Sequence, residues 1–198
     1  MKNKMEAERI EDTKAGYSFL LYGPQGVGKT YALGSLCTID TTLIINSEER
    51  NLGAVLSDFR SNKNLYITKP VTSYDDLMDF LFQLTEKYEE GDFPYAFVGI
   101  DGSTFLQRAF KNALEDVVAG RRDEKGKEVT LLDRWDIGER GWGAMGATMH
   151  RVTKALFHLT HYGVYTFLTA GVLKTPKWDK KLVYAPGFLG REYTFVVP

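Results

Sequence analysis

The residues that could do chemistry begin with the glycine-rich stretch FLLYGPQGVGKT at positions 19–30. Gly23, Gly28, Lys29 and Thr30 satisfy the spacing of a phosphate loop, whose backbone N–H groups surround a phosphate. In that pattern the lysine reaches the β- and γ-phosphates, and the threonine hydroxyl binds Mg²⁺. The stretch therefore predicts a site for a nucleoside triphosphate, and we take ATP and Mg²⁺ as the expected cofactors.

The candidate nucleotide-binding residues are consecutive residues of this loop and its exit. They are Gly23, Pro24, Gln25, Gly26, Val27, Gly28, Lys29, Thr30 and Tyr31. The glycines let the backbone curl and point its N–H groups inward, and the helix expected behind them directs its positive end at the same anion. The alternative is a chance glycine turn, but the apolar strand before the loop and the helix after it favour the phosphate site.

A metal-binding acid is expected at the end of a second apolar strand. Residues 96–101 read AFVGID, and Asp101 is the acid that directly ends this run. We predict that Asp101 and Thr30 bind Mg²⁺ together. Because Ser103 and Thr104 follow, the alternative is that Asp101 serves only as a helix cap.

Hydrolysis of ATP also needs a group that orients or deprotonates the attacking water. Many ring ATPases carry a glutamate directly after the metal aspartate, and this chain has Gly102 there. The other common position is the end of the strand after the phosphate-loop helix. The chain reads INSEER at 45–50, so Glu48 and Glu49 stand at that point. The alternative is that these acids are solvated charges in a turn.

The elements that must position these residues alternate between strands and helices. Apolar and β-branched runs predict strands, the first two of them buried, at 17–22, 42–46, 65–67, 95–100 and 164–170. Amphipathic patterns predict helices at 29–36, 52–59, 74–90, 104–118 and 142–162, the third capped by Ser73 and ended by Gly91. Two arms of a hairpin are expected within 172–184 and a last strand at 193–197. Such alternation implies an α/β fold, a three-layer α/β/α sandwich with a mainly parallel sheet and a C-terminal β-hairpin.

This order of motifs resembles the ATPase core of RecA-like recombinases. It is most similar to the small RecA-like ATPases of phages, which act in single-strand annealing and recombination, and the similarity covers roughly residues 17–197. In that family a glutamate ends the strand after the phosphate-loop helix, and a polar residue ends the strand after the metal aspartate. The resemblance implies a RecA-like P-loop NTPase core, with Glu48 as catalytic base beside Lys29, Glu49 as its reserve, and Thr169 as sensor of the γ-phosphate. Relatives often carry Gln or His slightly beyond that sensor position.

The resemblance also implies assembly into a ring or filament of identical subunits, with the nucleotide between neighbours. A basic residue of one subunit would then stabilise the charge that develops in the transition state of the next. Candidates for this residue are Lys174, Lys177 and Arg191, and their spacing does not choose among them.

A candidate surface for single-stranded DNA follows the expected sensor strand, where RecA-like proteins bind DNA. The run LKTPKWDKK at 173–181 places four lysines around one tryptophan: Lys174, Lys177, Trp178, Lys180 and Lys181. Lysines can neutralise backbone phosphates, and an indole can stack on a base. A solvated hairpin tip is an equally good interpretation of the same residues.

Composition bounds these hypotheses. The 198 residues are expected to form one domain, with residues 1–15 loose and residues 119–141 a long, charge-balanced loop. A formal net charge of −1 gives no general attraction to nucleic acid, so a local patch must provide it. The single cysteine excludes an intrachain disulfide and a cysteine-rich zinc site. Because we find no secretory signal and no run long enough to cross a membrane, a cytoplasmic location is expected, in the host if the gene is a phage gene.

The leading hypothesis is a Mg²⁺-dependent ATPase that couples nucleotide state to binding of single-stranded DNA in recombination, annealing or replication. One alternative is a kinase of nucleosides or nucleotides, because residues 119–141 contain four arginines and could form a lid. Another is an assembly or packaging ATPase, which would share every nucleotide motif but would not bind DNA.

Overall fold

The computed structural model describes residues 16–48, 51–71, 73–92, 94–107, 109–110, 138–176 and 182–186, with the backbone alone at 138–143, 173–176 and 182–186. A five-stranded sheet runs through this part of the chain, and its strands are all parallel. They are β1 (Ser18–Tyr22), β2 (Thr42–Asn46), β3 (Leu65–Ile67), β4 (Phe97–Asp101) and β5 (Tyr165–Ala170), in the spatial order β1-β5-β4-β2-β3. The predicted α/β fold with a mainly parallel sheet is confirmed.

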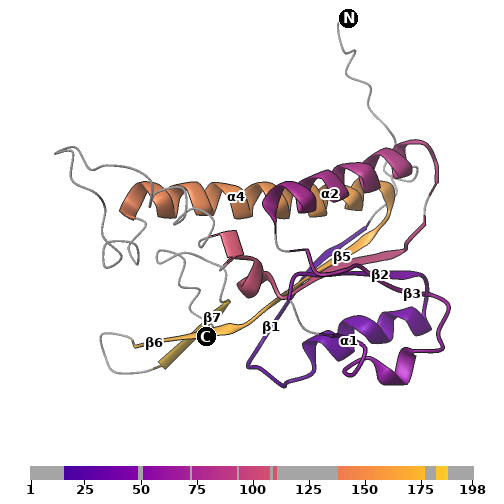
Figure 1. Cartoon of the computed structure of the whole chain (residues 1–198), viewed down its shortest axis with the longest axis horizontal. Coiled ribbons are helices and arrows are strands. Elements are labelled where there is room, and N and C mark those ends of the chain that lie inside the picture. Colours follow the sequence, from indigo (N-terminus) through magenta and orange to yellow (C-terminus); the bar gives the residue numbers. More distant parts are fainter. Residues whose placement is uncertain are drawn as a thin grey trace, which may run out of the picture.

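Helices cover both faces of this sheet (Figure 1). Helix α1 (Lys29–Ser35), continued by the 3₁₀ turn η2 (Leu36–Thr38), lies on one face, and α2 (Tyr74–Glu89) and α4 (Gly138–His158) lie side by side on the other. Two further 3₁₀ turns are η3 (Ser57–Phe59) and η5 (Leu159–Tyr162). The chain moves across the sheet in one direction through α1 and returns through α2 and α4, so right-handed crossovers place these helices on opposite faces.

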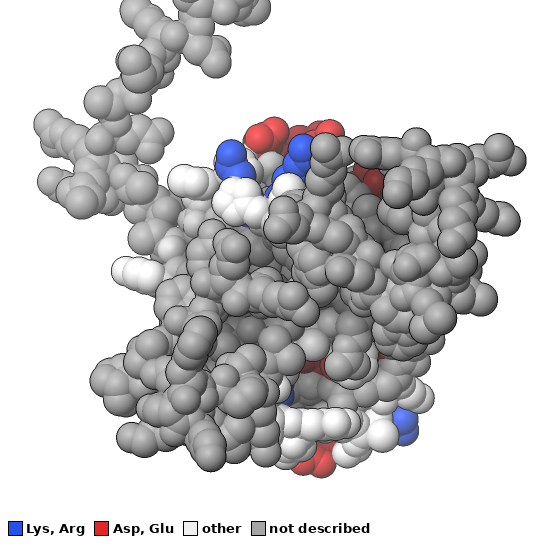
Figure 2. Space-filling model, turned by 90° about the vertical axis from the view of Figure 1, so that its left-hand side faces the viewer, with Lys and Arg blue, Asp and Glu red and all other residues white. Residues whose placement is uncertain are grey.

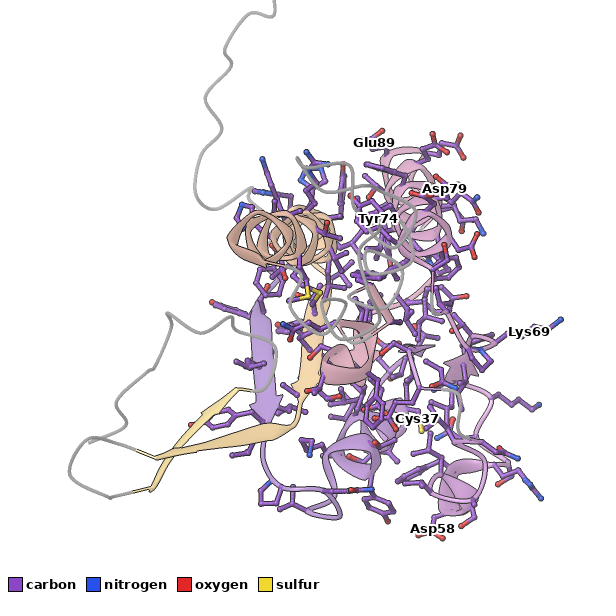
Figure 3. The ribbon with its side chains drawn as sticks, turned by 60° about the vertical axis from the view of Figure 1, so that its left-hand side comes forward. Cys37, Asp58, Lys69, Tyr74, Asp79 and Glu89 are labelled. Atoms are coloured by element: carbon purple, nitrogen blue, oxygen red, sulfur yellow. The ribbon has the colours of Figure 1, made fainter. Side chains whose placement is uncertain are left out.

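Alternating side chains of the strands fill a separate core on each face, as the two-residue period of a strand requires. In β2, Leu43 and Ile45 pack with the α2 and α4 layer, whereas Ile44 packs with Leu33 of α1. Cys37 is fully buried and lies on the α1 side (Figure 3). Burial raises the pKa of its thiol, which disfavours the reactive thiolate.

Helix α2 is capped by Ser73 and ended by Gly91, as the sequence predicts. The Ser73 hydroxyl accepts a hydrogen bond from the Asp76 backbone N–H at 3.5 Å, and Gly91 takes a positive φ of 84° just beyond the end of the helix. Its side chains Asp79 and Glu89 are exposed and lie on the side away from the sheet (Figure 3). The predicted inward positions Leu77, Leu81, Leu84 and Tyr88 are buried, and Phe80 packs against them partly buried.

The prediction that strand 17–22 is buried is wrong. Within the described residues β1 has a neighbour on one side alone, β5, and Phe19, Leu20 and Tyr22 are 42%, 39% and 43% exposed. An apolar run identifies a strand but does not say whether the strand lies at the centre or the edge of its sheet. The Phe19 ring still stacks on Phe167 of β5, with ring centroids 5.0 Å apart.

Two predictions of helices are also corrected, one for a whole segment and one for where a helix begins. Residues 52–59 form turns and then η3 instead of a helix, because the Asn51 side chain accepts from the Gly53 N–H at 2.8 Å and closes a competing turn. Leu52 and Leu56 have helical spacing but fill the small core beneath α1. Helix α4 begins at Gly138, inside the predicted loop 119–141, since low-propensity glycines at its start hid the extension of a strongly helical segment.

Several expected elements fall partly or wholly outside the described residues. Residues 103–107 and 109–110 are helical, and the remainder of the helix predicted at 104–118 is not described. Strands β6 (Val172–Pro176) and β7 (Leu182–Pro186) pair antiparallel. The residues between them, and the predictions at 1–15, 119–137 and 193–197, lie outside, so the C-terminal hairpin stays a prediction. No helix in the described ranges is long and apolar enough to cross a membrane.

Gly99 sets how closely α1 packs on the sheet. A Cβ there would lie 2.6 Å from Leu33 Cδ1 and 2.8 Å from Cδ2, and Leu33 is fully buried. We expect Gly99→Ala to lower the free energy of unfolding by about 1–3 kcal/mol through overpacking, measured by urea denaturation. The matched control is Gly146→Ala in α4, where a Cβ meets nothing within 4 Å and alanine should stabilise the helix by up to about 1 kcal/mol. Equal effects of the two substitutions would contradict this packing argument.

Candidate nucleotide-binding site

The parallel register brings the carboxyl ends of four strands into one line. Tyr22 of β1 pairs with Ala170 of β5, and Asn46 of β2 pairs with Asp101 of β4. After β2 the chain contributes Leu52 and Leu56 to the core on the α1 side, whereas after β4 it contributes Leu106 and Phe110 to the core on the α2 and α4 side. In parallel α/β sheets the crevice at such a divergence is where ligands bind.

The glycine-rich loop follows β1 at this edge. The Gly23 N–H donates to the Ala170 carbonyl oxygen at 3.3 Å, which ties the loop to β5. Gly26 and Gly28 have φ values of 81° and 92°, the left-handed geometry that turns successive N–H groups toward an anion. The Lys29 ammonium donates to the carbonyl oxygens of Gly23 and Pro24 at 2.8 and 2.9 Å. The lysine thus folds back over its own loop.

A cavity of about 400 Å³ opens beside the loop. It is lined by all the predicted nucleotide-binding residues except Gly23 and Val27, and also by Glu48, Asp101 and Thr169. Val27 is 61% exposed and instead lines a smaller hollow of about 300 Å³ between β1 and α1. Apart from Gly23 and Val27, the described residues that the sequence assigns to nucleotide, metal and catalysis therefore line one cavity, although they are far apart in the chain.

Hydroxyl groups hold the carboxylate of Asp101 inside the protein. Thr30 Oγ1 donates to Asp101 Oδ2 at 2.8 Å, and Thr169 Oγ1 donates to Oδ1 at 2.7 Å. Asp101 and Thr169 are each 1% exposed and Thr30 is 6% exposed. Short bonds to a charged acceptor in such a setting fix the carboxylate in one orientation.

These groups fit a magnesium ion. Because Thr30 gives its single hydroxyl proton to Asp101, the same oxygen can present a lone pair to a cation. Mg²⁺ is held in proteins by one or two carboxylates together with phosphate oxygens and water. Within the described ranges no group of three or more His, Cys, Asp and Glu could hold a metal ion.

Glu48 is positioned by the exit of β2. Its backbone N–H donates to Asn46 Oδ1 at 3.0 Å, and the preceding Ser47 donates from N and from Oγ to the Asp101 carbonyl oxygen at 3.1 and 2.7 Å. These bonds hold the end of β2 against the end of β4, so that the Glu48 side chain reaches the cavity wall. Its predicted reserve, Glu49, lies outside the described residues.

Thr169 occupies the position of the predicted sensor, and its hydroxyl is engaged. Besides donating to Asp101, Oγ1 accepts from the Gly102 N–H at 2.8 Å. The Thr169 carbonyl oxygen accepts from Ser103 Oγ at 2.6 Å. Thr169 therefore lines the cavity, and its polar groups already hold Asp101 and the turn that follows Asp101 through hydrogen bonds.

Tyr31 lies at the cavity wall with its hydroxyl pointed away from the loop. The hydroxyl donates to Asp58 Oδ2 at 3.1 Å, and the ring lies 5.1 Å from the Phe59 ring. The hydrogen bond and the negative charge of Asp58 raise the pKa of Tyr31. Tyr31 thus connects α1 to η3, in addition to its place beside the phosphate loop.

Several residues of this site belong to no motif that the sequence shows. Ser47 and Ser103 hold backbone carbonyls, and Thr104 Oγ1 accepts from the Gly171 N–H at 2.9 Å. Val55 and Phe105 are apolar wall residues that remain 39% and 45% exposed. Ser103 and Thr104 looked like helix-cap residues, and their spacing from Asp101 was the one available signal.

The side chains of the predicted DNA-binding and neighbour-contacting residues are outside the part of the chain that the structure describes. Lys174 is in β6, where the backbone alone is described. Lys177, Trp178, Lys180, Lys181 and Arg191 lie outside the described residues. On the face shown in Figure 2, the visible described charges include both signs at the upper and at the lower margin. Those residues alone therefore form no single-sign patch on that face.

Comparison with models of protein families and with curated protein sequences found no match.

The hydroxyl group of Thr169 should contribute more to the free energy of unfolding than its methyl group does. Thr169→Val keeps the shape but leaves the Gly102 N–H and one Asp101 oxygen without this partner, which we expect to lower the free energy of unfolding by about 1–3 kcal/mol. Thr169→Ser is the control, since it keeps the hydroxyl. Chemical denaturation of both variants measures the difference, and a valine variant as stable as the serine variant would show that the network contributes nothing.

Proposed function

We propose that this chain is a Mg²⁺-dependent ATPase of the RecA-like kind that couples its nucleotide state to binding of single-stranded DNA. The observation that supports it best is the convergence of Lys29, Thr30, Asp101 and Glu48 on one cavity at the carboxyl edge of a parallel sheet. A chance glycine turn would have no reason to face a buried carboxylate that accepts from the threonine of the same loop.

Lys29 would bind the β- and γ-phosphates of ATP. In this structure its ammonium group donates hydrogen bonds to the carbonyl oxygens of Gly23 and Pro24. Bonds from an ammonium group to phosphate oxygens are charge-assisted and stronger than bonds to neutral carbonyls. Nucleotide binding would therefore exchange weaker bonds for stronger ones without moving the lysine away from the loop.

Thr30 and Asp101 would hold the magnesium ion. When bound, the ion would neutralise charge on the phosphates and orient them. The protein's own part is to keep a hydroxyl oxygen and a carboxylate beside the phosphate loop. The bonds from Thr30 and Thr169 do this before any ligand arrives.

Glu48 is the best candidate for the catalytic base. Among the described residues, the acidic ones that line the cavity are Asp101 and Glu48. Asp101 is committed to hydroxyl groups and, in this proposal, to the metal. Glu48 thus is the cavity carboxylate that could take a proton from an attacking water, and the small-molecule kinase alternative assigns it no such task.

The strand order supports coupling to a distant surface. Because β5 lies between β1 and β4, Thr169 stands between the phosphate loop and the turn at Gly102. The chain passes from β5 through Gly171 directly into β6, and Gly171 is bonded to Thr104 of the cavity wall. A change at the γ-phosphate could therefore reach β6 and β7, the strands that flank the lysine and tryptophan residues.

Single-stranded DNA is the proposed partner of that surface. Lys174, Lys177, Trp178, Lys180 and Lys181 provide cations and a stacking platform in one short run. A homo-oligomeric ring or filament would place a further basic residue, Arg191 or one of the lysines, at the neighbour's nucleotide. Both parts rest on the resemblance to RecA-like proteins.

The nucleotide assignments predict separable defects. Lys29→Ala should abolish nucleotide binding, whereas Glu48→Gln should keep the affinity for a non-hydrolysable ATP analogue and lower the ATP turnover by about 10² or more. The control is Glu90→Gln at the exposed end of α2, which should change neither. Turnover is measured with and without single-stranded DNA. A Glu48→Gln variant that hydrolyses ATP at the normal rate would refute the base assignment, and phosphate transfer to a nucleoside would favour the kinase.

The DNA assignment predicts a change in salt dependence. Alanine at Lys177, Trp178, Lys180 and Lys181 should weaken binding to an unstructured oligonucleotide and flatten the plot of log affinity against log salt by about 0.7 for each phosphate that the protein no longer neutralises. The control pair is Lys63→Ala and Lys69→Ala, exposed lysines near β3. Unchanged affinity and slope, or no binding by the unaltered protein at low salt, would favour an assembly ATPase that does not bind DNA.

A further inference from the structure

Gly102 and Glu48 compete for the same space. Gly102 follows Asp101 with a φ of 94°. A Cβ built on it would lie 2.5 Å from Glu48 Cγ, 2.9 Å from Oε1 and 3.1 Å from Cδ. The side chain that residue 102 lacks would thus point into the volume that the Glu48 side chain fills.

We propose that positions 48 and 102 are alternative attachment points for one catalytic carboxylate, and that glycine at 102 positions Glu48. This inference rests on the proposed ATPase function. It assigns Gly102 a positioning role: the absence of a side chain there lets Glu48 lie over the turn after Asp101 and reach the cavity.

The sheet register explains why two such distant positions coincide. Asn46 is paired with Asp101 across neighbouring parallel strands. Glu48 is two residues beyond Asn46 and Gly102 is one residue beyond Asp101, so both follow the same end of the β2–β4 pair. A side chain from either strand can therefore enter the crevice at the same point.

Hydrogen bonds fix the backbone at residues 48 and 102. A clash between a new Cβ at 102 and Glu48 would therefore be relieved by movement of the Glu48 side chain. The Glu48 N–H donates to Asn46, and the Gly102 N–H donates to Thr169. Ser47 joins the two strands through the Asp101 carbonyl oxygen. Alanine at 102 would displace the Glu48 carboxylate, while Lys29 and Thr30 on the loop would keep their places.

A first experiment tests the steric part without any activity assay. The thermal unfolding midpoints of Gly102→Ala, Glu48→Ala and the double variant form a cycle, since Glu48→Ala removes the three atoms that would lie nearest to the new Cβ. Alanine also suffers backbone strain at positive φ, so Gly91→Ala is the matched control, with φ 84° and nothing within 4 Å of a Cβ. We expect Gly102→Ala to lower the midpoint more than Gly91→Ala does, and to lower it less when residue 48 is alanine. Additive effects in the cycle would overturn the inference.

A second experiment tests the positioning role with magnesium, ATP and single-stranded DNA present. Gly102→Ala should lower kcat about 10-fold or more, with the affinity for a non-hydrolysable ATP analogue unchanged within about 2-fold. In the Glu48→Ala background the same substitution should cause no further loss of kcat. Normal kcat in Gly102→Ala, or an equal further loss in that background, would overturn the role.

A third experiment moves the carboxylate. Glu48→Ala combined with Gly102→Glu should raise kcat at least about 10-fold above Glu48→Ala alone, and Gly102→Gln in the same background should not. A folded double variant without this gain would overturn the claim of alternative attachment points. If the unaltered protein hydrolyses no ATP, the proposed function fails instead, and the unfolding cycle still decides the steric relation between residues 48 and 102.

Discussion

The buried carboxylate of Asp101 is the constraint on which the rest of the site depends. A charge taken out of water must be satisfied by the protein, because an unpaired one would cost several kcal/mol (about 3–5 when a partner is removed). Its oxygens accept from Thr30 of α1 and Thr169 of β5, and its backbone carbonyl accepts from Ser47 after β2. One residue at the end of β4 thus fixes the phosphate loop, strand β5 and the exit to Glu48 relative to one another.

The local elements of this arrangement are readable from the sequence. The phosphate loop, the strand that ends in Asp101 and the capped helix α2 depend on neighbours a few residues apart, and each signal is specific at that range. The position of β1 is not readable in this way. Its apolar pattern would suit a central strand, yet in the described part of the chain it lies at an edge, because the order of strands depends on crossovers that hydropathy does not record.

The candidate site residues also divide into those that a local motif identifies and those whose contacts depend on how the strands are arranged. Lys29, Thr30 and Asp101 are identified by motif, and the cavity brings them together. The occupation of the Thr169 hydroxyl and the proximity of Glu48 to Gly102 involve partners 68 and 54 positions away, and arise from strand register alone. A motif therefore names the groups that could act, whereas the register decides which of them touch.

The sheet separates two unequal hydrophobic cores, and this inequality has a consequence for local stability. Within the described residues, the core cluster on the α1 side contains five buried hydrophobic residues and the cluster on the α2 and α4 side contains sixteen. The layer that buries less apolar surface opens at lower free energy, so the amide hydrogens of α1 should exchange with solvent before those of α2. A ligand bound to the phosphate loop would hold the weaker layer closed. Nucleotide would then stabilise one face of this protein selectively, since the opposite face is already held by its own larger core.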